Sequence, residues 1–236
     1  MSFLIGMTLN AQNLQSRLLK VSPENVAAFE AAAAKKTKMY NSKDGQPTYL
    51  TFKILTGPDA QHYVRMQTAT NISEFDKIDV EGDENWQKTT GSLHTSEGNN
   101  ILRANDSASY TPVNSPRVNH RRVLIYKIKA GMGDDFWRYR TRLVKALESA
   151  KWPKSVITLN CISGCDGDWV QVRYHHENFE DEYETIENAF PGVIKKYNEL
   201  FGNDSYEQDN QRMRMSVEEN RTRHLQLLPA LSSPWK

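Results

Sequence analysis

Apolar and polar residues alternate along six short segments of the chain, with the period of two that a half-buried β-strand requires. The segments are residues 16–21, 49–55, 61–68, 123–128, 156–161 and 169–174. In each half of the chain, a stretch with apolar residues at helical spacing follows the first of its three segments. The pattern therefore predicts two β-α-β-β units in tandem.

Local sequence indicates where both helices begin and which side they bury. Ser22, Pro23 and Glu24 are typical of a helix start, with a hydroxyl to cap amide groups and an acid in the first turn. The second helix is expected to begin near Gly133 and to end before Trp152. The expected buried stripes are Val26, Phe29, Ala33, Thr37 and Tyr40 in the first helix, and Phe136, Leu143 and Leu147 in the second. Each helix is therefore expected to cover one face of a sheet.

The two units match each other at a single offset. Phe29 falls on Phe136, which is an offset of 107 residues (136 minus 29). The other matches at this offset are Leu18–Val21 with Ile125–Ile128, Leu50, Phe52 and Ile54 with Ile157, Leu159 and Cys161, and Gly57 with Gly164. At an offset larger by one residue, 108 (173 minus 65), Arg65 falls on Arg173. Because one offset serves a strand, a helix, a second strand and a turn, we interpret the pattern as an internal repeat.

The two copies diverge after their third strands. We expect a short helix over Ile72–Ile78, a polar loop with some helix over Glu81–Asn100, a helix over Phe179–Phe190 that breaks at Pro191, a further helix to Phe201, and a helix over Tyr206–Arg223. The candidates for a closing edge strand are Ser107–Val113 and His224–Leu228.

This element order resembles the dimeric α+β barrel superfamily, and it covers residues 16–232. The resemblance implies an α+β fold in which two tandem ferredoxin-like β-α-β-β units form an intramolecular α+β barrel, each hiding the bare sheet face of the other. The expected organisation is an N-terminal arm or export-signal remnant over 1–15, a first repeat over 16–113, a linker over 114–120 and a second repeat over 121–236. The superfamily includes quinone-forming monooxygenases, haem-handling proteins, small-molecule lyases and members of no known activity. The resemblance implies a cleft between sheet and helices.

The N-terminus has the character of an export signal. Residues 2–12 are mostly apolar and uncharged, Ala11 is a small residue suited to a cleavage site, and Arg17 is the first charged side chain. The basic leading region is missing, so the segment resembles the tail of a signal that starts upstream. We therefore predict a secreted or periplasmic protein, with a cytoplasmic protein carrying an apolar arm as the alternative. No segment reaches the roughly 20 apolar residues of a membrane span.

Charge and cysteine content narrow the partners. With 30 basic and 29 acidic residues the net charge is +1, which gives no general attraction to nucleic acid. Arg138 and Arg142 share one side of a helix and are expected in solvent. Cys161 and Cys165 lie four residues apart, and we favour two free thiols over a disulfide because so short a loop is strained. Their spacing is not that of a zinc site.

His176 is the most prominent candidate for chemistry. Two adjacent residues of a strand point to opposite faces, so His175 and His176 cannot both enter a cleft. His176 is a candidate general base or haem or metal ligand, although a pair in solvent is the favoured interpretation. His94, His120 and His224 have no carboxylate or thiol at a spacing typical of a metal site, and the acidic segment Glu180–Glu184 is expected on the solvated face of a helix. We predict no metal site and no catalytic set.

The remaining functional hypotheses fall into three classes. The first is an exported protein, monomer or homodimer, that binds a small apolar or aromatic ligand in the cleft without catalysis. The second is a cofactor-free or haem-dependent monooxygenase-like enzyme, with haem as the one cofactor considered. The third is a structural or protein-interaction module. The residues expected to line the ligand site are His62, Trp169, Arg173, Tyr174 and His176.

Overall fold

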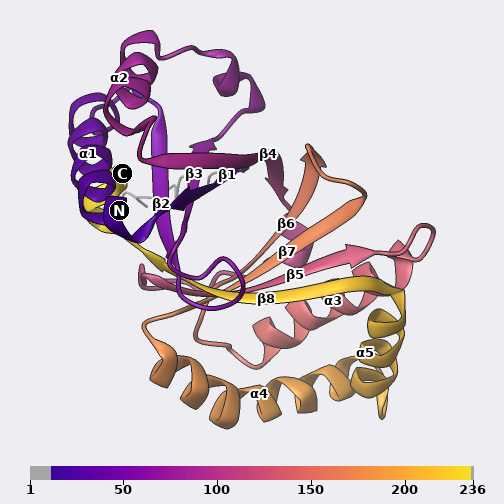
Figure 1. Ribbon diagram of the computed structural model, residues 1–236. Helices are drawn as coiled ribbons and strands as arrows, with labels where there is room; N and C mark the ends of the chain where they lie inside the picture. Colours follow the sequence, from indigo (N-terminus) through magenta and orange to yellow (C-terminus); the bar gives the residue numbers. More distant parts are fainter. Residues whose placement is uncertain (1–11, 235–236) are drawn as a thin grey trace, which may run out of the picture.

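The chain forms a closed barrel of eight strands with helices packed on its outside (Figure 1). The computed structural model describes residues 12–234. Residues 1–11, on which the export prediction depends, lie outside the described residues, so export stays a prediction. Among the described residues, no helix is both long and apolar enough to cross a membrane.

The predicted tandem units are both present. The first comprises β1 (Asn13–Val21), α1 (Val26–Tyr40), β2 (Thr48–Ile54), β3 (Tyr63–Ala69), α2 (Val80–Thr90) and β4 (His94–Ala104). The second comprises β5 (His120–Ile128), α3 (Gly133–Ser149), β6 (Val156–Ser163), β7 (Asp168–His176), α4 (Phe179–Phe201), α5 (Ser205–Ser216) and β8 (Val217–Leu227). The six strands and two helices expected from the alternation are therefore confirmed.

The strand order shows how two sheets close into one barrel. It runs β1-β3-β2-β8-β5-β7-β6-β4, and every pair of neighbours is antiparallel. Within each half the order is fourth, first, third and second strand, the ferredoxin-like arrangement. The halves join where β2 meets β8 and β4 meets β6. The intramolecular α+β barrel is therefore confirmed.

Strand register confirms the repeat and corrects one of its matches. Arg17 pairs with Arg65 in the first half, and Leu124 pairs with Val172 in the second, which are the same positions shifted by 107 (124 minus 17 and 172 minus 65). The counterpart of Arg65 is therefore Val172. Arg173 is its neighbour and lies on the opposite face of the strand.

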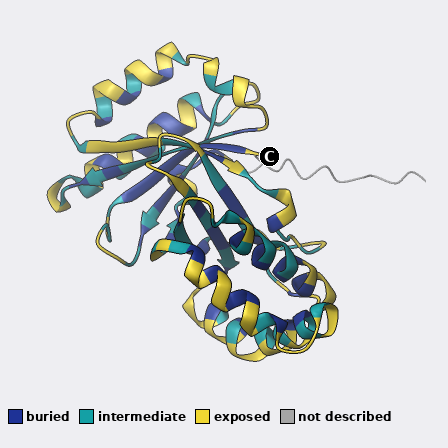
Figure 2. Ribbon diagram, turned by 90° about the vertical axis from the view of Figure 1, so that its right-hand side faces the viewer, coloured by how far each residue is buried: buried dark blue, intermediate teal, exposed yellow. Residues whose placement is uncertain are grey.

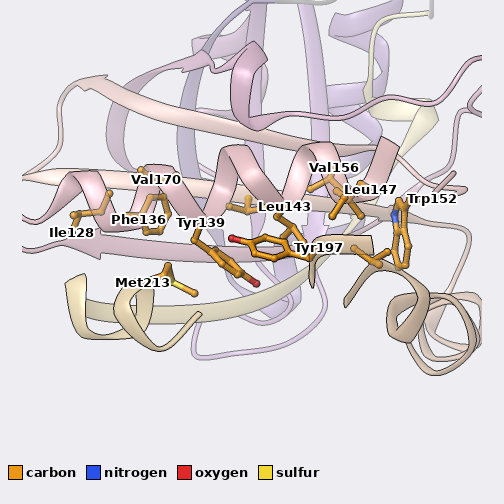
Figure 3. Close-up of a cluster of buried hydrophobic side chains, with 13 residues drawn as sticks. Ile128, Phe136, Tyr139, Leu143, Leu147, Trp152, Val156, Val170, Tyr197 and Met213 are labelled. Carbon is orange, nitrogen blue, oxygen red and sulfur yellow. The ribbon is translucent and has the colours of Figure 1, made fainter. Parts of the chain in front are cut away.

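Buried side chains form three clusters, one inside the barrel and one under each helical layer. In the ribbon coloured by burial, the buried residues are concentrated in the strands and on one side of the helices (Figure 2). The barrel interior includes Phe52, Met66, Leu102, Val123 and Leu225. Outside the second sheet, a row of side chains along α3 packs beside Tyr197 of α4 and Met213 of α5 (Figure 3). That row is Phe136, Tyr139, Leu143 and Leu147. Each sheet therefore has its inner face against its twin and its outer face against helices.

The chain departs from the expected elements at three places. The closing strand of the first half is β4, within the segment expected to be a loop, while the predicted strand Ser107–Val113 supplies only the bridge from Tyr110 to Val156. Pro191 lies inside a continuous α4 instead of ending it. The charged segment after Tyr206 changes from helix to strand at Val217, so β8 is longer than expected.

Two expectations about side chains are also wrong. Arg138 and Arg142 do not extend into solvent; both bind the carboxylate of Asp209, at 3.0 and 2.7 Å. Cys161 and Cys165 form a disulfide, with Cα atoms 6.4 Å apart. Gly164 lies between them at φ +83°, a left-handed conformation that glycine adopts readily, and this reverses the chain so that the cysteines meet.

Lys36 of α1 provides a pH test of the first helical layer. Its ammonium is buried, donates to Asn41 Oδ1 at 2.8 Å and lies 3.8 Å from Asp79. Burial, helped by the charge of Arg65, lowers the pKa of Lys36 to about 8. In the unfolded chain this lysine keeps its proton up to its ordinary pKa of 10.5. We therefore expect the free energy of unfolding to rise with pH between these values, since the unfolded state binds more protons.

The measurement is urea denaturation at several pH values between those two pKa values. Lys36→Met should reduce the rise of the unfolding free energy with pH. Lys35→Met, which removes an exposed charge next to Lys36, should leave this rise unchanged. An unchanged slope in Lys36→Met would contradict the assigned shift.

Candidate functional site

Each helical layer leaves a cavity against the outer face of its sheet, and the two differ in size. The first-half cavity has a volume of about 200 Å³ and the second-half cavity about 680 Å³. The first is narrowed by Arg65, which lies between the rings of Tyr49 and Trp86 at 4.6 and 4.7 Å. The volume of the second is in the range of small-molecule sites.

The second-half cavity lies between β5, β7 and β8 on one side and α3 and α5 on the other. It is rich in aromatic and cationic side chains. Its tyrosines are Tyr126, Tyr139, Tyr174 and Tyr206. Its arginines are Arg122, Arg140, Arg214 and Arg221. Burial raises the pKa of Tyr126 to about 12, so its phenol is neutral at pH 7. The lining therefore offers flat apolar walls with positive charge.

Arg140 is the buried cation of this cavity. It comes from α3, is 2% exposed, and donates to Tyr174 Oη at 3.3 Å and Thr158 Oγ1 at 3.4 Å. Its Nε has no hydrogen-bond partner within the described part of the chain. Both acceptors are hydroxyl groups and both contacts are long. Within the described part of the chain, no carboxylate forms a salt bridge with Arg140. An anion bound in the cavity would supply the negative charge that balances Arg140.

A cluster of histidines around one carboxylate lies further along the same outer face. Glu182 Oε2 is 3.1 Å from His120 Nε2 and 3.2 Å from His224 Nε2. Its other oxygen, Oε1, lies 3.5 Å from Nη1 of Arg122, which also lines the cavity. Phe179 packs on both imidazole rings, with centroids 4.6 and 4.9 Å away. The cluster therefore lies at the edge of the cavity, under the first turn of α4.

The environment sets the charge of this cluster. Burial opposes ionisation of Glu182, but hydrogen bonds from His120 and His224 outweigh it and hold the pKa of the carboxyl well below its usual value. The first turn of α4 adds the positive end of a helix dipole. His176 is 1% exposed, and burial lowers its pKa to about 4 despite the nearby Glu182 and Asp181. His176 is therefore neutral at pH 7.

Strand pairing explains why these histidines meet. His120 is directly opposite His176 on β5 and β7, and Arg122 is opposite His224 on β8, so all four side chains share the outer face. The first-half equivalents of His120 and His176 are Asn13 and Ala69, which pair in the same way. The cluster is therefore specific to the second half.

The five residues predicted to line a ligand site are separated by the fold. Tyr174 lines the second-half cavity, and His176 lies two residues beyond it on the same face. Arg173 points the other way, into the barrel. Trp169 and His62 are half-buried and line neither cavity. A ligand-binding role for these residues stays a prediction.

Three expectations about the histidines and acids are wrong. His176 is buried, not in solvent. His120 and His224 do have a carboxylate partner, which lies 62 and 42 residues away in sequence. Glu182 was expected on a solvated helix face, but its side chain is 10% exposed. Glu182 and Thr185 lie three residues apart on one side of α4 and both are buried, and neither is an apolar residue that would mark this side as inward in the sequence.

Comparison with known proteins gives a fold and no close relative. No protein-family model matches the chain, and no curated protein matches its sequence. Among solved structures, a proposed monooxygenase from Lactobacillus acidophilus NCFM matches with a TM-score of 0.63 at 9% identity, over 96% of this chain and 97% of its own. An anthrone oxidase-like protein matches with a TM-score of 0.55 at 10% identity, over 93% of this chain and 92% of its own. A chlorite dismutase from Candidatus Nitrospira defluvii, in complex with imidazole, matches with a TM-score of 0.58 at 10% identity, over 94% of both chains.

The chain has the dimeric α+β barrel fold. It carries both halves of that barrel in one polypeptide, as the tandem repeat predicts. At these identities the likeness establishes the fold alone.

Haem is the cofactor that this fold brings into question, and the lining does not suit it. Haem iron needs an axial donor such as a histidine, a thiolate, a methionine or a tyrosinate. Among the described residues that line the second-half cavity there is no histidine and no cysteine. Met213 does line it, but methionine binds haem iron together with a histidine, and none is at hand there. Burial raises the pKa of Tyr126, Tyr139 and Tyr206, which disfavours the tyrosinate form. The histidines of this dimeric α+β barrel lie beyond the cavity, around Glu182. The lining therefore does not fit haem.

Proposed function

We propose that this protein is a monooxygenase-like enzyme that uses no haem and binds a planar aromatic anion in the second-half cavity. One observation carries the proposal: Arg140 is buried among tyrosines with two long contacts to neutral acceptors. A buried cation is costly without a counter-charge. A phenolate or carboxylate on the substrate would meet the guanidinium, while the ring would lie against the tyrosines.

The lining also supports a chemical role. A substrate that has lost its proton to solvent is electron-rich enough to react with O₂ directly. One oxygen atom would then enter the substrate, the other would leave as water, and the substrate itself would supply the electrons. Arg140 would favour the deprotonated substrate by stabilising its negative charge. The aromatic rings of Tyr126 and Tyr174 would exclude water and fix the plane of the substrate ring. The fold of a proposed monooxygenase and of an anthrone oxidase-like protein supports this reaction class.

Binding can be tested with naphthoate as the aromatic anion and naphthamide as its neutral analogue, both in buffer with EDTA. We expect naphthoate to bind more tightly, and Arg140→Met to weaken it by about 10- to 100-fold through loss of a charge-assisted hydrogen bond. Lys145→Met is the matched control, because it removes one exposed positive charge from the same helix. Equal binding by Arg140→Met and wild type would contradict the proposed site.

Catalysis is tested separately with a dihydroxyanthrone as substrate in the same buffer, by O₂ consumption. The proposal predicts uptake that saturates with substrate and falls in Arg140→Met. Binding without O₂ uptake would instead support the ligand-binding hypothesis, in which the cavity has no catalytic role.

A further inference from the structure

The strongest unexplained feature outside the proposed substrate contacts is the group of imidazoles around Glu182. His120 Nε2 lies 3.1 Å from Glu182 Oε2, and His224 Nε2 lies 3.2 Å from the same oxygen and 3.3 Å from Oε1. The three donor atoms lie within 4.8 Å of one another. Among the described residues, no other group of three or more histidine, cysteine or acidic side chains has this geometry.

The spacing of the donor atoms suits a bound ion. Nitrogen and carboxylate ligands lie about 2.1 Å from a first-row divalent metal, so two of them at tetrahedral or octahedral angles are about 3.0–3.4 Å apart. The two separations here, 3.1 and 3.2 Å, fall in this range. The distances also permit hydrogen bonds, so a further observation must separate an ion site from a polar network.

The missing hydrogen-bond partners of His176 favour an ion site. His176 lies opposite His120, on the same outer face as the cluster. It is 1% exposed, and neither of its ring nitrogens has a hydrogen-bond partner among the residues that the structure describes. The Oδ2 atom of Asp181 lies 3.6 Å from its Nδ1, and that oxygen already accepts from the backbone of Glu177 at 2.9 Å. A buried imidazole is normally hydrogen-bonded. An ion or its bound water at the cluster would supply the missing partner.

The groups around the cluster are arranged to hold its ligands in place. His224 Nδ1 lies 3.0 Å from Thr56 Oγ1, and this contact to the ring's other nitrogen fixes the orientation of the ring. Glu182 Oε1 lies 3.5 Å from Arg122 Nη1 and 3.3 Å from His224 Nε2, and these contacts hold the carboxylate with Oε2 toward His120. Thr56 follows β2, so its contact depends on the closure of the barrel between the two halves. Phe179 covers the rings from outside.

We propose that His120, His224 and Glu182 form a mononuclear site for a first-row divalent transition metal, such as Zn²⁺, Co²⁺ or Fe²⁺. Imidazole donors favour these ions over Mg²⁺ and Ca²⁺, and two histidines with one carboxylate leave coordination positions open. The open positions would be taken by water beside His176 or by a group on a ligand at the Arg122 end of the cavity. The site is independent of the aromatic-anion proposal, since ion binding needs no ligand in the cavity.

The test is a titration of EDTA-treated, full-length protein with Co²⁺, followed by its visible absorption. We expect one ion per chain, and Zn²⁺ should compete for the site and raise the Tm. His224→Ala and Glu182→Gln should each weaken Co²⁺ binding by more than about 100-fold. His94→Gln is the matched control, because it removes a half-buried histidine from the first half.

Folding of the variants is checked by circular dichroism and by naphthoate binding, which the metal ligands do not supply. Loss of Co²⁺ binding in a variant that still binds naphthoate supports the site. No saturable Co²⁺ binding at millimolar concentrations by folded wild type would overturn the proposal. So would binding that survives in both Glu182→Gln and His224→Ala. Neither result bears on the aromatic-anion test, which is made in EDTA.

Discussion

Asp209→Ala is expected to lower the free energy of unfolding by about 2–4 kcal/mol, because it removes a buried carboxylate that is shared by a buried phenol and by two arginines with 31% and 35% exposed side chains. Asp209 is 3% exposed on α5. Its Oδ2 accepts hydrogen bonds at 2.7 Å from Tyr197 of α4 and at 2.7 Å from Arg142 of α3, and Oδ1 accepts from Arg138 at 3.0 Å. Removing the carboxylate leaves a buried phenol and two guanidinium groups without their shared acceptor.

The network ties together the three helices of the second layer. Since α3 and α5 form one wall of the second-half cavity, Asp209→Ala should also weaken naphthoate binding. The matched control is Asp135→Ala, which removes the other carboxylate bound to Arg138, at 2.7 Å. Its side chain is 33% exposed, so the loss should be less than about 1 kcal/mol. Urea denaturation measures both, and equal losses in the two variants would show that burial of Asp209 does not matter.

The strands that alternate were predictable because every second side chain packs in the apolar interior of the barrel, while the side chains between them face the more polar outer surface. β4 was missed for the opposite reason. Six of its first seven residues, from His94 to Asn100, are polar and its solvent side is open, so backbone pairing with β1 and β6 holds it, not a periodic apolar face. Pro191 likewise signals a helix end, yet α4 continues because packing of Val193 and Tyr197 against the second-half core stabilises the following turns. Tertiary contacts outweighed local preference at both places.

The candidate site was less predictable, since its donors come from separate elements. His175 and His176 were correctly expected on opposite faces, and that follows from the pleat alone. The meeting of His120, His224 and Glu182 depends on the order of β5, β7 and β8 and on the rotation of α4. No spacing along the chain encodes it. The second-half cavity was unpredictable for the same reason, because it too depends on how separate elements pack. Its size depends on the extra helix α5, which has no counterpart among the described residues of the first half.

The repeat match between Arg65 and Arg173 shows how one residue of register changes the energetics of a side chain. Arg65 faces the helices and is well satisfied there, donating to Thr51 Oγ1, Leu231 O and Thr37 Oγ1 at 2.6–3.2 Å. Arg173 faces the barrel interior, where it contacts the sulfur of Met66 and where the charges of Arg121 and Arg223 act on it. Both arginines are buried, but Arg65 donates to three oxygen acceptors, whereas Arg173 donates to the oxygen of Gln171.

Arg173 is therefore expected to cost stability. Its Nη2 donates to Gln171 at 2.9 Å and its Nη1 lies 3.3 Å from the sulfur of Met66, while Nε has no partner among the described residues. Burial, with the charges of Arg223 and Arg121, lowers the pKa of Arg173 to about 9. At pH 7 the group is still protonated, so the cost of burying its charge is fully present.

We expect Arg173→Met to raise the free energy of unfolding by about 1–4 kcal/mol at pH 7, as replacing buried charge by a hydrophobic side chain of similar volume often does. Arg65→Met is the control and should destabilise the protein by about 1–3 kcal/mol, since it strands buried acceptors. Chemical denaturation at pH 7 measures both variants. A loss of stability in Arg173→Met would show that the barrel interior holds this charge by contacts that outweigh its desolvation.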